Sequence, residues 1–158
     1  MNAIAALYPH ATVLKGDSAT PAATLAGLGH ASLVHFAAHG HHQPENALFS
    51  NLDLAGGALF GYDLHHGVHT PDTAVLSSCD LGLADVRPGD ETLGLATALL
   101  AGGTATVVAS VARVADRTAM DVMVRYHREA VAGRTPAAAL AAAVPADLAT
   151  GFICVGVG

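Results

Sequence analysis

The stretch TAVLSSCDLG, residues 73–82, decides the fold prediction. Its apolar part, Ala74 to Leu76, has the composition of a buried strand, and two serines, a cysteine and an aspartate follow it. The chain has only two cysteines, and one of them, Cys79, stands where this strand stops. In open α/β sheets functional groups gather at the carboxyl ends of the strands. Cys79 is therefore a candidate for chemistry, set against the plainer interpretation that it is a small buried hydrophobe.

The rest of the chain alternates strand-like and helix-like segments. A small hairpin is predicted within 52–64, and strands are predicted at 11–16, 31–40, 73–78, 104–111 and 151–158. Helices are predicted after Thr20, from Asp90, from Asp116 and after Thr135. Strands separated by helices, with apolar central strands, indicate a three-layer α/β/α sandwich with a mostly parallel sheet.

The helix predicted from Asp116 to about Ala132 carries a stripe of residues at helical spacing. Asp116 itself is expected to be the N-cap. We expect the stripe to be ordinary core packing, and it comprises Met120, Val124, His127 and Val131. His35, in the middle of the 31–40 strand, is expected to be a core histidine or one that supports a site from behind.

Composition limits the functions that need to be considered. The 158 residues are expected to form one domain, 1–158. Apolar residues make up 52% and the formal net charge is −6. No basic cluster supports nucleic-acid binding, and no apolar run approaches the ~20 residues of a membrane span. The N-terminal residues do not read as a signal peptide, and a reducing cytoplasm is the expected location.

Cys79 needs a base before it can attack a carbonyl group. A free thiol has a pKa near ~8.5 and is mostly protonated at neutral pH. His39 lies at the end of the 31–40 strand, and neighbouring strands are only about 4.8 Å apart. Gly40 lets the backbone approach a substrate closely, and its N–H can point at an oxyanion together with the N–H of Cys79. The residues alone thus favour a His-Cys pair.

The two strand-end motifs together resemble a known family. LVHFAAHG (33–40) followed by TAVLSSCDLG is similar to the active-site pair of the CHAT domains, caspase-like cysteine peptidases related to separases. The resemblance continues, in the same order, through ETLGLATALLAGGTATVVASVARVAD, AVAGRTPAAALAAAV and GFICVGVG. The 40-residue interval from His39 to Cys79 is comparable to the spacing of about 50 in caspases.

The resemblance implies a caspase-like fold and a cysteine endopeptidase. It implies that His39 is the general base, that Cys79 is the nucleophile, and that Gly40 and Cys79 supply the oxyanion N–H groups. It implies a polypeptide substrate, no metal and no organic cofactor. A tetratricopeptide-repeat or other sensor domain is expected as a partner or as a further segment. Family domains are often longer than this chain. The sequence is therefore also a candidate for a truncated domain that lacks the N-terminal part.

The substrate pocket is less well defined by the resemblance. The family builds it from the strand after the cysteine and the loop beyond, here Ser110 to Asp116, and Asp80 is a further candidate. Ala112 stands where the family usually has Trp. Separases use an acid further along to receive a basic side chain, but an ungapped count lands on Met120, so that preference does not carry over.

Two other functions stay open. The first is a catalytically silent, caspase-like interaction or regulatory module, which the short chain and the missing Trp favour. The second is a histidine-rich metal-binding domain, because the chain has ten histidines. The spacing of strong zinc motifs is absent, and the loop histidines concerned are His41, His42, His65, His66 and His69. Cys154, inside an apolar strand, is expected to be structural.

Overall fold

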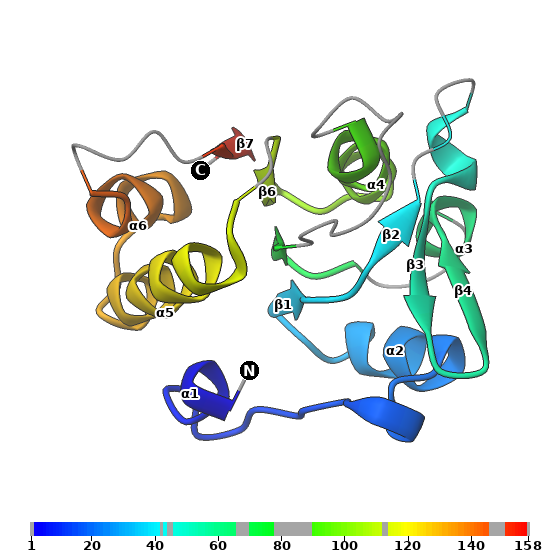
Figure 1. Ribbon diagram of the computed structural model, residues 1–158, viewed down its shortest axis with the longest axis horizontal. Coiled ribbons are helices and arrows are strands. Elements are labelled where there is room, and N and C mark those ends of the chain that lie inside the picture. The colour runs from blue at the N-terminus through cyan, green and yellow to red at the C-terminus, as the bar shows by residue number, and fades with distance from the viewer. Residues whose placement is uncertain are drawn as a thin grey trace.

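A computed structural model shows a sheet with helices on both of its faces (Figure 1). It describes residues 2–41, 43, 46–65, 70–77, 90–111, 114–145 and 151–157. Within these ranges no helix is long and apolar enough to cross a membrane.

The main sheet has the strand order β1-β5-β6-β7. Strands β1 (Leu33–Phe36), β5 (Thr73–Leu76) and β6 (Thr106–Ser110) run parallel, and β7 (Phe152–Gly156) pairs with β6 in the antiparallel sense. The central strands β5 and β6 are almost entirely buried, as expected for strands that are covered on both faces. The prediction of an α/β fold with a mostly parallel sheet is confirmed.

Alternate residues of the central strands supply two separate cores. Ala74 and Leu76 belong to a cluster on the face covered by α2 (Pro21–Leu28) and α4 (Asp90–Ala101). Val75 and Val108 belong to a second cluster on the opposite face. That face is covered by α1 (Asn2–Ala5), α5 (Asp116–Val131) and α6 (Pro136–Ala143). Because side chains alternate between the two faces along a strand, each central strand packs against both helical layers.

Side-chain caps fix the starts of two helices. The Thr20 hydroxyl accepts a hydrogen bond from the Ala23 N–H at 3.2 Å, and Thr135 does the same for Ala138 at 3.4 Å. Each cap satisfies one backbone donor that the first helical turn leaves unpaired. Both predicted helix starts are confirmed.

A small antiparallel sheet stands beside the main one. It has the order β2-β3-β4 and consists of β2 (Gly40–His41), β3 (Asn51–Leu54) and β4 (Gly57–Phe60). The turn between β3 and β4 uses Gly56 and Gly57 at φ 79° and 152°, which side chains rarely adopt. The predicted hairpin is confirmed. A 3-10 helix, η2 (Ala47–Phe49), precedes it, and α3 (Gly61–His65) follows it.

The strand predicted at 11–16 is wrong. Residues 11–15 have no regular structure and lead into a 3-10 helix, η1 (Gly16–Ser18). The Ser18 hydroxyl accepts from the Lys15 N–H at 3.0 Å and donates to the Lys15 carbonyl at 2.8 Å. These bonds occupy the backbone groups of Lys15 that a strand ladder would need.

The predicted core stripe of α5 is wrong in part. His127 is fully buried as expected, but Met120 and Val131 are 54% and 51% exposed. The buried face lies one position away and consists of Ala119, Val122, Met123, Tyr126 and His127. The reason is geometric: α5 packs against α1, α6 and the sheet together, so its apolar arc is wider than one stripe. Asp116 is the first helical residue, and Ala115 is the N-cap.

The core cluster between the sheet and the helices α2 and α4 leads to a prediction about stability. Leu99 of α4 is fully buried there, so Leu99→Ala should lower the free energy of unfolding by about 3 kcal/mol through lost burial and a residual cavity. Urea unfolding measures this. Val131→Ala is the control, since that side chain is half-exposed and its loss should change stability by about 0.5 kcal/mol or less. Equal effects of the two changes would contradict the assigned core.

Candidate functional site

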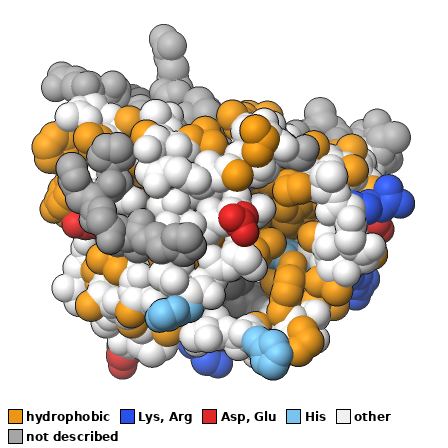
Figure 2. All heavy atoms as spheres, turned by 180° about the vertical axis from the view of Figure 1, so that it is seen from behind, with side chains coloured by type: hydrophobic (Ala, Val, Ile, Leu, Met, Phe, Trp, Pro, Cys, Tyr) orange, Lys and Arg blue, Asp and Glu red, His pale blue; other side chains and the backbone are white. Residues whose placement is uncertain are grey.

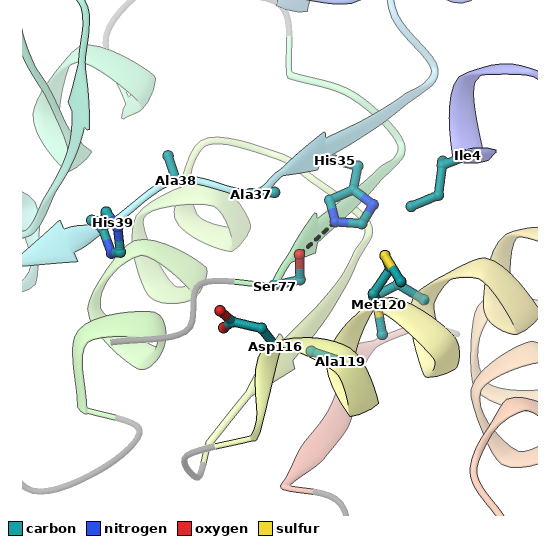
Figure 3. A pocket seen from close by; sticks show the side chains of 10 residues that line it. Ile4, His35, Ala37, Ala38, His39, Ser77, Asp116, Ala119 and Met120 are labelled. Carbon is teal, nitrogen blue, oxygen red and sulfur yellow. Dashed lines mark hydrogen bonds between the residues drawn. The ribbon is translucent and has the colours of Figure 1, made fainter. Parts of the chain in front are cut away.

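A pocket of about 250 Å³ opens where β1 and β5 end. Figure 2 shows the face of the molecule that is hollowed, with hydrophobic side chains and an acidic side chain around the hollow. The strand ends, α1 and the first turns of α5 supply its walls (Figure 3). The lining residues are Ile4, His35, Ala37, Ala38, His39, Ser77, Asp116, Ala119, Met120 and Met123. Most of this wall is apolar, with a few polar groups, as in many binding sites.

His39 and Gly40 occupy the link between the two sheets. His39 is exposed, lies three positions beyond the end of β1, and lines the pocket. Its carbonyl accepts a hydrogen bond from the Asp53 N–H at 2.8 Å. Because bonded and non-bonded pairs alternate in an antiparallel ladder, the next pair, Gly40 with Leu52, is a non-bonded one. The Gly40 N–H therefore points away from β3.

Glycine at position 40 also has a packing reason. A Cβ atom there would lie 2.9 Å from the backbone carbonyl oxygen of Asn51, closer than real side chains approach. The strand β2 can pair with β3 at this distance only because residue 40 has no side chain.

Four side chains form a continuous hydrogen-bonded chain behind the pocket, which we call the Tyr8–Ser77 chain. The Tyr8 hydroxyl lies 2.7 Å from His127 Nδ1, and His127 Nε2 lies 2.8 Å from His35 Nδ1. His35 Nε2 lies 2.6 Å from Ser77 Oγ (Figure 3). Ser77 Oγ in turn donates to the Phe36 carbonyl at 3.3 Å. The chain thus runs from a half-buried phenol to the wall of the pocket.

Burial keeps both histidines of the chain neutral. It lowers the pKa of His127 from 6.5 to about 4. Burial, followed by repulsion from His127, lowers the pKa of His35 to about 3. The two rings stack with centroids 5.0 Å apart, and the Tyr8 and Tyr126 rings meet His127 edge-on. Packing therefore fixes the ring orientations that the hydrogen bonds require.

Asp116 brings an acid to the pocket from the first turn of α5. Its side chain is exposed and lines the pocket. In Figure 3 its carboxylate points into the space between Ser77 and His39. It makes no hydrogen bond or ion pair with another described residue. A carboxylate at a helix N-terminus is favoured by the helix dipole, so Asp116 is stable there without a partner.

Of the other predicted site residues, the structure describes Ser110 alone, and it does not line this pocket. Ser110, the last residue of β6, is 3% exposed, and its side chain is buried between β6 and its neighbours. Its register partner is Phe152 of β7. Cys79 and Asp80 lie outside the described residues. Cys154 is half-buried on β7 and packs against the second core.

Of the histidines considered for metal binding, the structure describes His41 in β2 and the backbone of His65 at the end of α3. His41 Nε2, on β2, makes an exposed hydrogen bond with Asp53 Oδ2, on β3, at 2.9 Å. His42, His66 and His69 fall outside the described residues. Within the described ranges, no three histidine, cysteine or acidic side chains come together as metal ligands would.

Comparison with protein families gives one match, the CHAT domain, over residues 1–148. The chain belongs to the CHAT domain family. A search of curated proteins found no match. CHAT domains have a caspase-like fold, in agreement with the main sheet described above, and the family is expected to consist of caspase-like peptidases. The resemblance of the strand-end motifs is thus confirmed at the level of the family.

The Tyr8–Ser77 chain was not predicted from the sequence. His35 and His127 were both placed at buried positions, and buried polar groups need hydrogen-bond partners. This need for partners is the one sequence signal that could have indicated the chain. It does not identify the partners, because Tyr8 and His127 are 119 positions apart and His35 and His127 are 92 apart.

The depressed histidine pKa values predict a loss of stability in mild acid. Below pH 6.5 His35 and His127 bind protons in the unfolded chain. In the folded protein they stay neutral until the pH falls to about 3 to 4. Each site therefore contributes stability that is fully present above pH 6.5 and falls by up to about 1.4 kcal/mol per pH unit below it. Urea unfolding between pH 7 and pH 5 measures the slope.

His127→Gln provides the comparison, because glutamine keeps a donor and an acceptor but does not titrate. The slope of its unfolding free energy against pH should be smaller than that of the wild type, by the amount that corresponds to about one bound proton. The same slope in both proteins would show that His127 is protonated in the folded state.

Proposed function

We propose that the chain is a cysteine endopeptidase domain in which His39 is the general base and Cys79 the nucleophile. The register of the parallel pair β1–β5 carries this proposal. Phe36 pairs with Leu76, 40 positions later, and 40 positions also separate His39 from Cys79. Each of the two residues follows the last paired residue of its strand by three positions in the sequence, and parallel strands end at the same edge of a sheet. The sequence spacing of His39 and Cys79 thus equals the register of the two strands, as expected for a base and a nucleophile that act on one substrate.

The reaction follows from these two groups. His39 takes the thiol proton of Cys79, and the sulfur forms a bond to the carbonyl carbon of the peptide. The Gly40 and Cys79 N–H groups hold the resulting oxyanion. The C–N bond then breaks, and the amine leaves with the proton from His39. Water attacks the thioester, His39 receives a proton from it, and the C–S bond breaks to release the acid.

Two features of the described residues support this reaction. The Gly40 N–H points away from β3 and is not used in the ladder. The pocket next to His39 is largely apolar and large enough for one side chain. We infer that it receives the side chain on the acyl side of the cleaved bond, with Asp116 at its rim.

The second candidate is a catalytically silent caspase-like module. One observation favours it: the His39 side chain is exposed and makes no hydrogen bond with a described residue, so no carboxylate or carbonyl in these ranges orients it. A catalytic histidine is usually oriented by such a group. The following experiment separates the two candidates.

Replacing the nucleophile should abolish cleavage without unfolding the protein. Cys79→Ala removes the only atom that forms the acyl-enzyme, so turnover of a peptide library should fall below detection while the thermal midpoint stays near that of the wild type. Cys154→Ala is the matched control and should keep activity, because Cys154 lies on β7 and does not line the pocket. Undiminished turnover by Cys79→Ala would refute the mechanism.

His39→Ala should slow alkylation of Cys79 by iodoacetamide at neutral pH, because the thiolate loses its base and its counter-charge. Peptide mass spectrometry reads both cysteines in one sample. Cys154 is the internal reference, since burial raises the pKa of its thiol and its labelling should be slow in both proteins. Equal labelling of Cys79 in both proteins would favour the silent module.

Asp116 should bias the pocket toward positively charged side chains. Exposed ion pairs contribute up to about 1 kcal/mol, so Asp116→Asn should lower the preference for lysine over norleucine, its uncharged analogue, by up to about fivefold. The ratio of kcat/KM for the two peptides measures this. Asp121→Asn makes the same charge change on α5 at an exposed position outside the pocket wall. If both variants alter the ratio equally, the effect comes from net charge and not from Asp116.

A further inference from the structure

One direction of the hydrogen bonds in the Tyr8–Ser77 chain satisfies every group in it. Ser77 Oγ donates its single proton to the Phe36 carbonyl, so it must accept from His35. His35 then carries its proton on Nε2 and accepts on Nδ1. His127 must in turn donate from Nε2 and accept on Nδ1, which matches a Tyr8 hydroxyl that donates inward. Each group has one proton to give, and all four bonds are made.

The opposite direction makes one bond fewer inside the protein. If Ser77 donated to His35, both rings would carry the proton on Nδ1, and His127 would donate to the Tyr8 oxygen. The bond from Ser77 to the Phe36 carbonyl would be lost, and the Tyr8 proton would need an acceptor outside the chain. Neutral rings admit only these two arrangements, since a neutral imidazole has one donor and one acceptor.

The favoured direction determines what Ser77 offers to the pocket. A hydroxyl oxygen has two lone pairs. One lone pair of Ser77 accepts from His35, the proton is committed to Phe36, and Ser77 lines the pocket wall. The remaining lone pair can accept a hydrogen bond but the group has no proton to donate. Asp116, at the rim of the same pocket, is also an acceptor.

We propose that Ser77 is a specificity-determining residue, held by the Tyr8–Ser77 chain as a hydrogen-bond acceptor, so that the pocket selects side chains ending in an N–H donor. The inference rests on the proposed function for the nature of the occupant, a substrate side chain. His35 contacts Ser77 directly. His127 and Tyr8 act on Ser77 through His35 and are positioning residues. The apolar wall formed by Ala37, Ala119 and Met123 suits the aliphatic stem of such a side chain.

The first test reads the direction of the chain without any substrate. NMR of protein labelled with nitrogen-15 in histidine reports which ring nitrogen carries the proton, and His127→Gln and His35→Gln assign the signals. The inference requires the Nε2–H form for both residues at pH 7. The Nδ1–H form at either residue would reverse Ser77 into a donor and overturn the proposal.

The second test measures selection with a matched pair of probes. Acetyl-glutamine amide ends in N–H donors and a carbonyl, and the γ-methyl ester of acetyl-glutamate amide has the same shape with acceptors only. Titrating each into the labelled protein and following the His35 signals gives two dissociation constants. The glutamine probe should bind about fivefold more tightly, the value of one hydrogen bond. Equal binding, or a preference for the ester, would overturn the proposal.

Variants separate the chain from general packing effects. Ser77→Ala should lower the ratio of the two constants toward one, with Asp116 left as the other acceptor of the pocket. Tyr8→Phe removes the hydrogen bond that holds the outer end of the chain, so Ser77 is held less firmly and the ratio should fall by less than it does in Ser77→Ala. Tyr126→Phe is the matched control: Tyr126 also meets the His127 ring edge-on, but its buried hydroxyl has no hydrogen-bond partner among the described residues. If Tyr126→Phe lowered the ratio as much as Tyr8→Phe does, the chain would not be the cause.

The binding measurements need no turnover, which keeps the two proposals separable. Protein that cleaves no peptide but prefers the glutamine probe fails as a peptidase while the role of Ser77 stands. Protein that cleaves peptides through Cys79 but binds both probes equally retains its function and loses this inference.

Discussion

The parallel pairing of β1 with β5 is the constraint on which the rest of the site depends. Parallel strands bring their carboxyl ends to one edge, and the register of this pair sets which following residues face each other. Because Phe36 is level with Leu76, the segment containing His39 and the segment leading to Cys79 leave the sheet in step. The pocket opens between those strand ends and α5. A slip in this pairing would move the segment after β1 relative to the segment after β5 even if both strands remained buried.

The Tyr8–Ser77 chain stabilises this arrangement from the opposite side. It links the segment after α1, helix α5 and the ends of both strands, all through neutral groups. A buried ionised group would be costly without a partner, whereas neutral imidazoles can satisfy each other. Burial and mutual repulsion disfavour a proton on either ring. The same property makes the strand ends sensitive to acid, since the unfolded chain accepts the protons that the folded chain excludes.

Much of the fold could be predicted from the sequence because its signals are local. Thr20 and Thr135 stand one position before Pro at helix starts, and their hydroxyls make the expected caps. The central strands are apolar on both faces, which indicated a covered parallel sheet. The failures occurred where a local pattern was overridden by its surroundings. Residues 11–15 have strand-like composition, but the neighbouring Ser18 holds the Lys15 backbone in a turn.

The candidate site was predicted less completely for a related reason. His39 and Gly40 follow from their place after an apolar strand, and Asp116 from its place before a helix. The partnership of His35 with His127 joins positions 92 residues apart, and no spacing rule connects them. Ser77 lies in no sequence motif of a serine nucleophile, and no local pattern shows its hydrogen-bonding role. Its hydrogen-bond direction becomes readable only once both ends of the chain are known, because a hydroxyl takes its role from its neighbours. The hydrogen-bonding role that we propose for Ser77 thus depends on a chain whose far end, the Tyr8 hydroxyl, lies 69 positions before the serine, and tertiary structure alone contains that information.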